Sequence, residues 1–479
     1  MPVSFTSSFG YSVDVSGSDI LILAPDGTET HAPFPEGAIF YDGGWVPSFE
    51  HNVAGGDENF VVIFSTVNHD RSVAAQFYDY NGNMLGAELD VNSATYGGHR
   101  PSVWDLGDGR YVFLWQTNYP YGYPPFEQDR VGYVVGRVVD AGSQVMEDTF
   151  IIAAGVNLLR DAASIDVSET GVISVSWTAY DLDDIYLDTY QSVYGGQLND
   201  VVNGAAFDDF LYGRDGNDTI NGYAGNDVVD GGTGNDTLTG GDGNDTVGGG
   251  TGNDLIVGGN GAGDDVYNGG EGMDTVKYTS AVSGITANLA TGIITSSAGG
   301  DAAGIGTDKI SGIECVIGGH FADRLLGDAS DNVLHGMRGA DRLTGGAGRD
   351  TLWGGSGGDV LSGGLGRDVL IGGPGPDTFR FDTRPAPGNV DLIQGFLPSQ
   401  DRILLDDSVF TSIGPLGALA QAAFVVGESA STEAHRVVFD AGTGKLFYDP
   451  DGSGETAQVL IARIAGLEAT LSASDFLVF

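Results

Sequence analysis

The chain has 479 residues and is strongly acidic, with 66 Asp and Glu against 20 Lys and Arg and a formal charge of −46. This charge argues against nucleic acid as a partner, because surfaces that bind nucleic acid are basic. No run approaches the ~18 apolar residues that a membrane helix needs, so we expect no transmembrane segment. Cys315 is the single cysteine, which excludes an intramolecular disulfide and predicts a small buried side chain.

Residues 1–194 are rich in aromatic and β-branched residues, and turn signals divide them into short predicted strands. A loose repeat places strands at 59–64, 110–115 and 172–177, with a hairpin at 75–83. We therefore predict a propeller-like or sandwich β domain. A closed propeller needs at least about four blades. Three copies are clear and residues 20–23 are the candidate start of a fourth, so a small propeller, an open β stack and a sandwich all stay open.

An acidic stretch near the end of this domain permits two interpretations. Four aspartates lie among three tyrosines: Asp181, Asp183, Asp184 and Asp188, with Tyr180, Tyr186 and Tyr190. Two carboxylates about 5–10 Å apart in a carbohydrate site would support glycoside chemistry. That arrangement would make the protein an extracellular enzyme acting on polysaccharide. A solvated loop that leads into the acidic repeats is the alternative, and we favour it.

From Gly195 onward the sequence repeats every nine residues as Gly-Gly-x-Gly-Asn-Asp-x-apolar-x. Copies follow without insertion from 195 to 257. An eleven-residue copy at 258–268 and a regular copy at 269–277 complete a first block, and a second block occupies 318–380. The sixth position is acidic and the eighth is apolar. A nine-residue period of this kind is the signature of a parallel β-solenoid.

The chemistry of one copy explains the period. Its glycines allow positive φ in a turn, and the short strand that follows points one apolar side chain inward. Each copy is half a coil, so aspartates eighteen residues apart lie one above another. Carboxylates stacked at strand spacing repel one another and need a cation between them. Carboxylate and carbonyl oxygens, without His or Cys, favour Ca²⁺ over zinc and magnesium.

The predicted calcium ligands are the sixth-position aspartates of both blocks. They are Asp200, Asp209, Asp218, Asp227, Asp236, Asp245, Asp254, Asp265, Asp274, Asp323, Asp341, Asp350, Asp359, Asp368 and Asp377. Three departures put calcium occupancy in question: Asn332 at a sixth position, the two-residue insertion near Gly261, and Arg214 at a second-position glycine. A disordered Gly/Asp linker is the alternative, but a linker has no reason to keep an apolar residue in every copy.

These nonapeptides resemble those of the RTX family, the secreted hemolysin-type calcium-binding repeat proteins. The resemblance also covers an interrupting element that ends at 308–318 and a cap that includes 389–393, 447–454 and 475–479, so it extends over residues 195–479. It implies calcium held by the sixth-position Asp and by turn carbonyls of neighbouring coils. It further implies export by the type I secretion apparatus with an uncleaved C-terminal signal. Asp475 and the four apolar residues after it resemble that signal, and the last strand of the cap is the structural alternative.

The predicted architecture is all-β with five segments. They are a propeller-like adhesive domain at 1–194, a β-roll block at 195–277, a β interrupting segment at 278–317, a second β-roll block at 318–380, and a cap with the secretion signal at 381–479. The first segment is similar to propeller-like repeats of bacterial RTX proteins. No basic and apolar leader is visible in residues 1–6. Extracellular calcium modules bind with a Kd on the order of 10⁻⁴–10⁻³ M, which predicts an extracellular or cell-surface location. We expect a secreted calcium-binding protein that contacts a cell surface or extracellular polysaccharide.

Catalytic motifs are absent or are explained by the repeat. The chain lacks the His-Glu-x-x-His of zinc proteases, and its seven histidines are scattered. A Gly-x-Ser-x-Gly match at 354–358 resembles a hydrolase elbow but lies inside one nonapeptide. The Asp449-Pro450-Asp451-Gly452 segment begins like an EF-hand loop without its twelfth-position Glu, and we interpret it as a turn. We therefore favour a protein that is not an enzyme.

The two blocks differ in charge, which generates a first prediction. Residues 195–277 contain fourteen Asp and one Glu against one Arg and one Lys, a net charge of −13; residues 318–380 contain eight Asp against six Arg, a net charge of −2. Self-repulsion opposes the compact state, so the first block should depend on calcium more strongly. Calcium titrations of the isolated blocks, followed by circular dichroism, measure this dependence. Equal midpoints would contradict it, and the arginines would then be ordinary surface charges.

Overall fold

A computed structural model describes residues 199–479 apart from 260, 262, 298–303 and 468. Before residue 199 it describes strands β1–β15, the turn residues 24–28, 80, 81 and 83, and residue 195. The chain divides into two compact units, Met1–Ser192 and Val193–Phe479. Helix in the described ranges is limited to two short 3-10 turns, η1 (Gln421–Ala423) and η2 (Ala473–Asp475). Neither of these could cross a membrane.

The first unit is built from consecutive antiparallel strands. Three four-stranded sheets follow one another along the chain: β1 (Val3–Thr6), β2 (Ser12–Ser16), β3 (Asp19–Leu23) and β4 (Glu29–Ala32); β5 (His51–Gly55), β6 (Asn59–Ser65), β7 (Val73–Asp79) and β8 (Met84–Asp90); β9 (Gly98–Asp105), β10 (Arg110–Asn118), β11 (Val131–Asp140) and β12 (Phe150–Val156). Strands β13 (Ser164–Val167), β14 (Ile173–Tyr180) and β15 (Tyr186–Tyr194) follow, and β13 pairs with β14. Each four-stranded sheet pairs its strands in chain order, as successive hairpins do.

Successive sheets of the first unit pack against each other. Phe77 on β7 contacts Tyr111 and Phe113 on β10, with ring centroids 5.4 Å and 6.5 Å apart. Strand β5 lies next to both β1 and β9. The strands predicted at 59–64 and 110–115 are β6 and β10, and β14 contains most of the strand predicted at 172–177. Repeated four-stranded sheets are the unit of a propeller. The small propeller, the open β stack and the sandwich stay alternative predictions for this unit.

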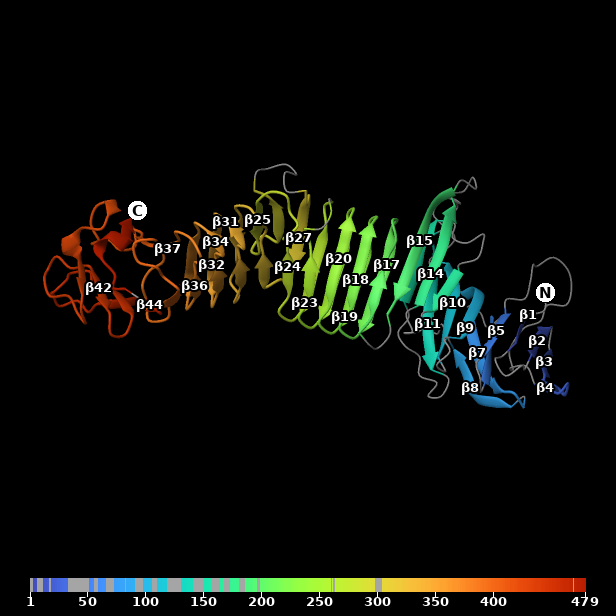
Figure 1. The fold of residues 1–479 in the computed structure, drawn as a ribbon. Coiled ribbons are helices and arrows are strands. Elements are labelled where there is room, and N and C mark those ends of the chain that lie inside the picture. Colours follow the sequence, from blue (N-terminus) through green and yellow to red (C-terminus); the bar gives the residue numbers. More distant parts are fainter. Residues whose placement is uncertain are drawn as a thin grey trace, which may run out of the picture. The chain divides into compact units, whose positions relative to one another are not determined.

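The second unit is a parallel β-roll made of two facing sheets, whose strands lie side by side in Figure 1. Within this unit, sheet 1 contains β17 (Asp209–Asp215), β19 (Val228–Thr233), β21 (Thr246–Thr251), β23 (Val266–Glu271), β25 (Ile285–Asn288), β26 (Ile293–Ser296), β27 (Thr307–Ser311), β29 (Arg324–Leu326), β32 (Arg342–Gly348), β35 (Val360–Gly366), β37 (Thr378–Phe381), β39 (Arg402–Leu405), β40 (Gly417–Ala418) and β45 (Phe476–Val478).

Sheet 2 contains β16 (Val201–Asn203), β18 (Thr219–Ala224), β20 (Thr237–Asp242), β22 (Leu255–Val257), β24 (Thr275–Lys277), β28 (Cys315–Ile317), β30 (Val333–His335), β33 (Thr351–Trp353), β36 (Val369–Ile371), β38 (Asp391–Gln394), β44 (Val459–Ala465), β43 (Lys445–Tyr448), β42 (Val437–Asp440) and β41 (Phe424–Val426). A small pair, β31 (Arg338–Gly339) with β34 (Ser356–Gly357), lies in the turns. The predicted all-β fold with a parallel β-roll is confirmed.

The nonapeptide period produces this stacking. In the regular copies, strands pair in parallel with a shift of eighteen residues, so that Phe210 lies beside Val228 and Val228 beside Thr246. Consecutive strands of these copies alternate between the sheets, and each copy forms half a coil, as predicted. Eighth-position side chains such as Leu238 and Leu352 are fully buried between the sheets. Each such burial stabilises the fold by about 1.5–3 kcal/mol.

The segment between the blocks adds a hairpin to sheet 1 only. In sheet 2, β24 pairs with β28 and β28 with β30, so stacking continues across the two blocks. In sheet 1, β23 pairs with β27, and the antiparallel pair β25 and β26 lies between β27 and β29. Cys315 begins β28 and is buried, as predicted. The two blocks therefore belong to one roll.

The roll ends in a cap with antiparallel strands. Sheet 2 passes from β38 to β44, and β44, β43 and β42 form an antiparallel meander. Residues 476–478 form β45, which pairs with β39 and β40. The last strand of the cap, which the sequence offered as the structural alternative to a secretion signal, is therefore present. Just before it, Asp475 accepts the backbone N–H of Ser472 at 2.7 Å and that of Ser399 at 2.9 Å. These bonds attach the C-terminal residues to the cap.

Backbone geometry requires the glycines of the turns. Gly234 has a φ of +130°, in the left-handed region that side chains rarely adopt. A Cβ there would collide with the carbonyl oxygen of Gly216 in the preceding coil. Arg214, Tyr223 and Met337 stand at second positions with φ of 77°, 78° and 73°. Left-handed backbone costs about 1–2 kcal/mol at each of these residues.

Substitution of one turn glycine tests this constraint. Gly234→Ala should lower the free energy of unfolding of the calcium-bound chain by about 2 kcal/mol or more, since it adds both left-handed strain and a collision. Gly248→Ala is the matched control, because the nearest atom to its added Cβ lies 4.0 Å away. Urea unfolding followed by circular dichroism measures both, and equal losses would contradict the assignment.

Candidate metal centre

The sixth-position residues lie in two columns, one at the start of the strands of each sheet. Column 1 leads into sheet 1 and contains Asp209, Asp227, Asp245, Asp265, Asp308, Asp323, Asp341, Asp359, Asp377 and Asp401. Column 2 leads into sheet 2 and contains Asp200, Asp218, Asp236, Asp254, Asp274, Glu314, Asn332, Asp350, Asp368 and Asp391. All fifteen predicted ligands belong to a column, and all are buried.

Backbone hydrogen bonds orient the carboxylates within each column. The N–H of one aspartate donates to the Oδ1 of the aspartate in the next coil, from Asp218 to Asp236 at 2.7 Å and from Asp236 to Asp254 at 2.8 Å. The second block repeats the bond, for example from Asp341 to Asp359 at 2.8 Å. One oxygen of each carboxylate is therefore held by the neighbouring coil.

The other carboxylate oxygen is bare at most column positions, meaning that it is buried and has no hydrogen-bond donor. Among the described residues the bare Oδ2 atoms belong to Asp218, Asp227, Asp236, Asp245, Asp254, Asp274, Asp341, Asp350, Asp359, Asp368 and Asp377. Burial of a charged oxygen without a partner costs several kcal/mol or forces the group to become neutral. A cation would remove that cost.

Carbonyl oxygens lie close to these bare atoms. The space that a Cβ on Gly231 would fill is bordered by Oδ2 of Asp236 and by the carbonyl oxygen of Gly249 in the next coil. The same arrangement surrounds Gly345, with Oδ2 of Asp350 and the carbonyl oxygen of Gly363. In the described residues no group of three or more His, Cys, Asp or Glu side chains forms a metal cluster. Backbone carbonyls would therefore have to complete each coordination shell.

This donor set fits calcium. Calcium takes six to eight oxygen ligands, including backbone carbonyls, in a flexible geometry. Nitrogen and sulfur ligands, which zinc prefers, are absent from the described columns. Bound calcium would neutralise the repulsion between stacked carboxylates and link neighbouring coils.

Burial raises the pKa of the column carboxylates. The pKa of Asp227, Asp341 and Asp350 rises to about 7 because burial disfavours the charged form, and neighbouring column carboxylates add to the rise. For Asp236 and Asp377 the same causes raise the pKa to about 6. Protonation and calcium are thus alternative ways to neutralise the same oxygens.

At a few column positions Oδ2 accepts a hydrogen bond from the protein. Backbone N–H groups of the same turn donate to Oδ2 of Asp209 at 2.6 Å, of Asp323 at 2.7 Å and of Asp401 at 2.7 Å. At Asp265 the donor is instead the hydroxyl of Tyr267, at 2.6 Å. The sequence could not reveal these bonds at Asp209, Asp265 and Asp323, because these aspartates match the repeat.

Asn332 keeps the column hydrogen bond but changes the second atom. Its N–H donates to Oδ1 of Asp350 at 2.8 Å, and its own Oδ1 accepts from the N–H of Asp328 at 2.8 Å. The buried Nδ2 has no partner. An amide nitrogen is a donor, so this position offers a cation one oxygen fewer. Asn332 is one of the three departures from the repeat that put calcium occupancy in question.

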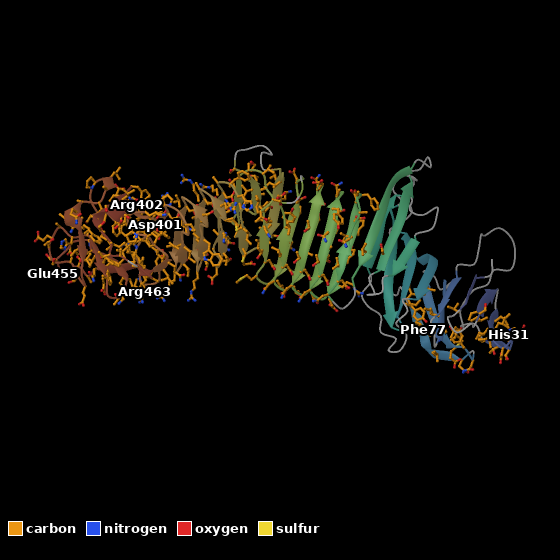
Figure 2. All side chains as sticks on the ribbon, viewed as in Figure 1. His31, Phe77, Asp401, Arg402, Glu455 and Arg463 are labelled. Carbon is orange, nitrogen blue, oxygen red and sulfur yellow. The ribbon has the colours of Figure 1, made fainter. Side chains whose placement is uncertain are left out.

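The columns contain acidic residues that the repeat alone did not identify. Asp308 and Glu314 continue them through the interrupting segment, since they accept the N–H of Asp265 at 3.1 Å and of Asp274 at 3.0 Å. Asp391 and Asp401 continue them into the cap, and Figure 2 labels Asp401 next to Arg402. All four precede a buried apolar residue by two positions, as in Asp308-Lys309-Ile310. That acid-x-apolar pattern was the available signal.

Fifth-position asparagines form a second hydrogen-bonded row beside column 2. The side-chain oxygen of Asn217 accepts the N–H of Asn235 at 2.7 Å, and that of Asn235 accepts the N–H of Asn253 at 2.7 Å. In the second block Arg349 stands at this position and donates its N–H to Asp331, at 2.7 Å. An arginine side chain has no acceptor, so it cannot extend the row to the next coil.

Other candidate sites do not form a catalytic arrangement in the described residues. Ser356 lies in a coil turn, where it pairs with Arg338 of the preceding coil, so the Gly-x-Ser-x-Gly match belongs to the roll. Asp449 accepts the N–H of Gly452 at 2.8 Å and forms the turn expected there. Asp181, Asp183 and Asp184 lie outside the described residues, as does the side chain of Asp188 on β15.

Comparisons with known proteins identify the repeats. The profile of the RTX calcium-binding nonapeptide repeat matches residues 194–229, 221–256, 317–352 and 344–379. No curated protein matches the chain. The solution structure of the AlgE6R3 subunit from the Azotobacter vinelandii mannuronan C5-epimerase is similar, at 33% identity over 32% of this chain and 80% of that chain, with a TM-score of 0.24. The AlgE6R2 subunit of the same enzyme matches at 29% identity over 32% and 90%, with a TM-score of 0.23.

A parallel β-roll with buried columns of carboxylates defines a calcium-binding repeat protein. The matched profile lies within both repeat blocks and agrees with the observed coils. The two blocks are RTX calcium-binding nonapeptide repeats, and repeats of this family bind several Ca²⁺ ions.

The raised pKa values predict an unusual pH dependence without calcium. A carboxyl group whose folded pKa lies above its unfolded value of about 3.9 stabilises the fold below that value and loses this contribution as pH rises through the folded pKa. For Asp227, Asp236 and Asp341 the loss should occur as pH rises through about 6–7. In chelator, urea unfolding should therefore show a more stable roll at pH 5 than at pH 8. With saturating calcium the order should reverse, since protons then compete with the metal. Greater calcium-free stability at pH 8 would contradict this account.

Proposed function

We propose that the second unit is an extracellular calcium-dependent scaffold, which folds on calcium outside the cell and presents the first unit to a cell surface or to extracellular polysaccharide. The bare Oδ2 atoms of the two columns are the main support for this proposal. Of the fifteen aspartates predicted from the sequence, the eleven with a bare Oδ2 are its proposed ligands.

Folding and calcium binding are coupled in this proposal. The unfolded chain has no stacked carboxylates and no converging carbonyls, so the site forms only with the coils. Without calcium the folded chain must bury many carboxylates within a total charge of −46. The free energy of calcium binding would then supply much of the free energy of folding.

The same coupling supports an extracellular location. Extracellular modules bind calcium with a Kd on the order of 10⁻⁴–10⁻³ M, well above cytosolic calcium levels. A chain of this kind would stay largely unfolded inside the cell and fold where calcium is abundant. Passage through the type I secretion apparatus, which requires an unfolded chain, fits that behaviour.

Circular dichroism of the full chain with and without calcium tests the coupling. Calcium should convert the roll from a largely disordered spectrum in chelator at pH 8 to a β spectrum, with a midpoint on the order of 10⁻⁴–10⁻³ M. Magnesium at the same concentration should have a much weaker effect, because it requires a more exact octahedral site. A full β spectrum in chelator at pH 8 would overturn the proposal.

A matched pair of variants tests the ligand assignment. Asp236→Asn removes a bare column oxygen, so calcium titration should show fewer bound ions or an affinity lower by about tenfold or more. Glu271→Gln removes the same charge from an exposed side chain at the end of β23 and should leave the titration unchanged. Equal responses would show that total charge, rather than the column, governs binding.

A further inference from the structure

The bare Oδ2 atoms occur in two separate groups along the roll. The first group extends from Asp218 to Asp274 and the second from Asp341 to Asp377. In column 1 the gap between them lies between Asp245 and Asp341 and contains Asp265, Asp308 and Asp323. In column 2 it lies between Asp274 and Asp350 and contains Glu314 and Asn332. This gap contains the coils where the two blocks meet.

Tyrosine hydroxyls are the partners of Oδ2 at two positions of column 1. The hydroxyl of Tyr267 donates to Oδ2 of Asp265 at 2.6 Å, and that of Tyr278 donates to Oδ2 of Asp308 at 2.6 Å. Both rings are buried, with exposed fractions of 2% and 0%. A phenol that donates to a carboxylate gives the buried oxygen a hydrogen-bond partner, where calcium would be the partner elsewhere in the columns.

The rings also fill the space beside the first-position glycine. In regular copies the place of a missing Cβ is bordered by a carboxylate oxygen, as at Gly249 with Oδ2 of Asp254. At Gly258 that place is bordered by ring atoms of Tyr267 and Tyr278, each 2.9 Å away. An ion beside this glycine would have to displace a packed aromatic ring.

The remaining positions of the gap use other donors. Asp323 Oδ2 accepts the N–H of Gly319 at 2.7 Å, and column 2 contains Glu314 and Asn332 in place of aspartate. Glu314 accepts the N–H of Asp274 at 3.0 Å. Both columns therefore lose their bare oxygens over the same coils, whereas the stacking of sheet 2 continues through them.

We infer that Tyr267 and Tyr278 form a calcium-free joint, which divides the roll into two runs of calcium sites that load separately. The inference rests on the proposed function, because it requires the bare oxygens on either side to bind calcium. In a linear stack each coil contacts only its neighbours, so a joint that folds without metal can uncouple one run from the other. It can also provide an ordered end from which each run stacks.

Hydrogen exchange of the full chain, with calcium and in chelator at pH 8, tests the joint directly. In chelator the amides of Asp265 and Lys309, which donate to Asp308 and to the carbonyl of Asp265, should stay protected. Those of Asp218 and Asp236, whose acceptors belong to the first run, should lose protection. Equal loss at all four amides overturns the inference and leaves the proposed function intact. If no amide loses protection, both are overturned.

Substitutions separate the hydroxyl contacts from ring packing. Tyr278→Phe and Tyr267→Phe keep the rings, and each should reduce the protection of the joint in chelator by about tenfold, the effect of losing one hydrogen bond to a charged group. Tyr223→Phe is the control, since that hydroxyl bonds to Asn203 on the exposed side of sheet 2. Unchanged protection in both joint variants would overturn the role assigned to the hydroxyls.

Calcium counting by native mass spectrometry provides a second readout. Asp308→Asn should bind as many calcium ions as the unmodified chain, whereas Asp236→Asn should bind fewer. Both aspartates are buried members of a column, so they differ mainly in the partner of Oδ2. A lower count for Asp308→Asn would place an ion at the joint and overturn the inference.

Discussion

The buried carboxylate of each coil is the group on which the roll depends. One of its oxygens accepts a backbone N–H from the adjacent coil, and at most positions the other has no donor within the protein. The first contact links neighbouring coils, and the second makes the stack incomplete without a cation or a proton. The neighbouring glycine has no Cβ, which leaves room for the oxygen, and the turn brings carbonyls to the same place. A single geometric unit therefore determines period, metal preference and sensitivity to acid.

Much of the second unit could be predicted because its coils are nearly identical. The eighteen-residue stacking, the inward apolar row and the aspartate columns all follow from one residue type at one spacing. Prediction was weaker where the partner of a residue is distant in the chain. Asp308 bonds to a coil 43 residues away, and the insertion before it conceals the period. The tyrosines at 267 and 278 are ordinary buried aromatics in the sequence, and only the folded coils bring them to the carboxylates. In the first unit the individual strands at 59–64 and 110–115 were predictable, whereas the arrangement of the sheets depends on contacts such as Phe77 with Tyr111.

The two repeat blocks use the same coil with different surroundings. The first block adds asparagine rows that cross-link its turns, and the second replaces some of these positions with arginine, which ends the row at that point. The first block is also more acidic outside its columns, whereas the second is nearly neutral overall. A roll assembled in this way varies in stability along its length although its backbone stays regular. Differences between the regular coils of the two blocks thus arise mainly from the turns and outer faces, while the apolar interior stays constant.

The cap has a consequence for solubility. A parallel roll whose coils all share one outline ends in a row of unpaired N–H and C=O groups that matches the last coil of any other copy. Growth end to end into a fibre would cost little, because the added coil would make the same contacts as those already present. In the cap the strands β44, β43 and β42 reverse direction, and β45 closes against the short strand β40. This end of the roll no longer has the outline of a repeat, so a coil of another molecule would not find the contacts of a regular coil here.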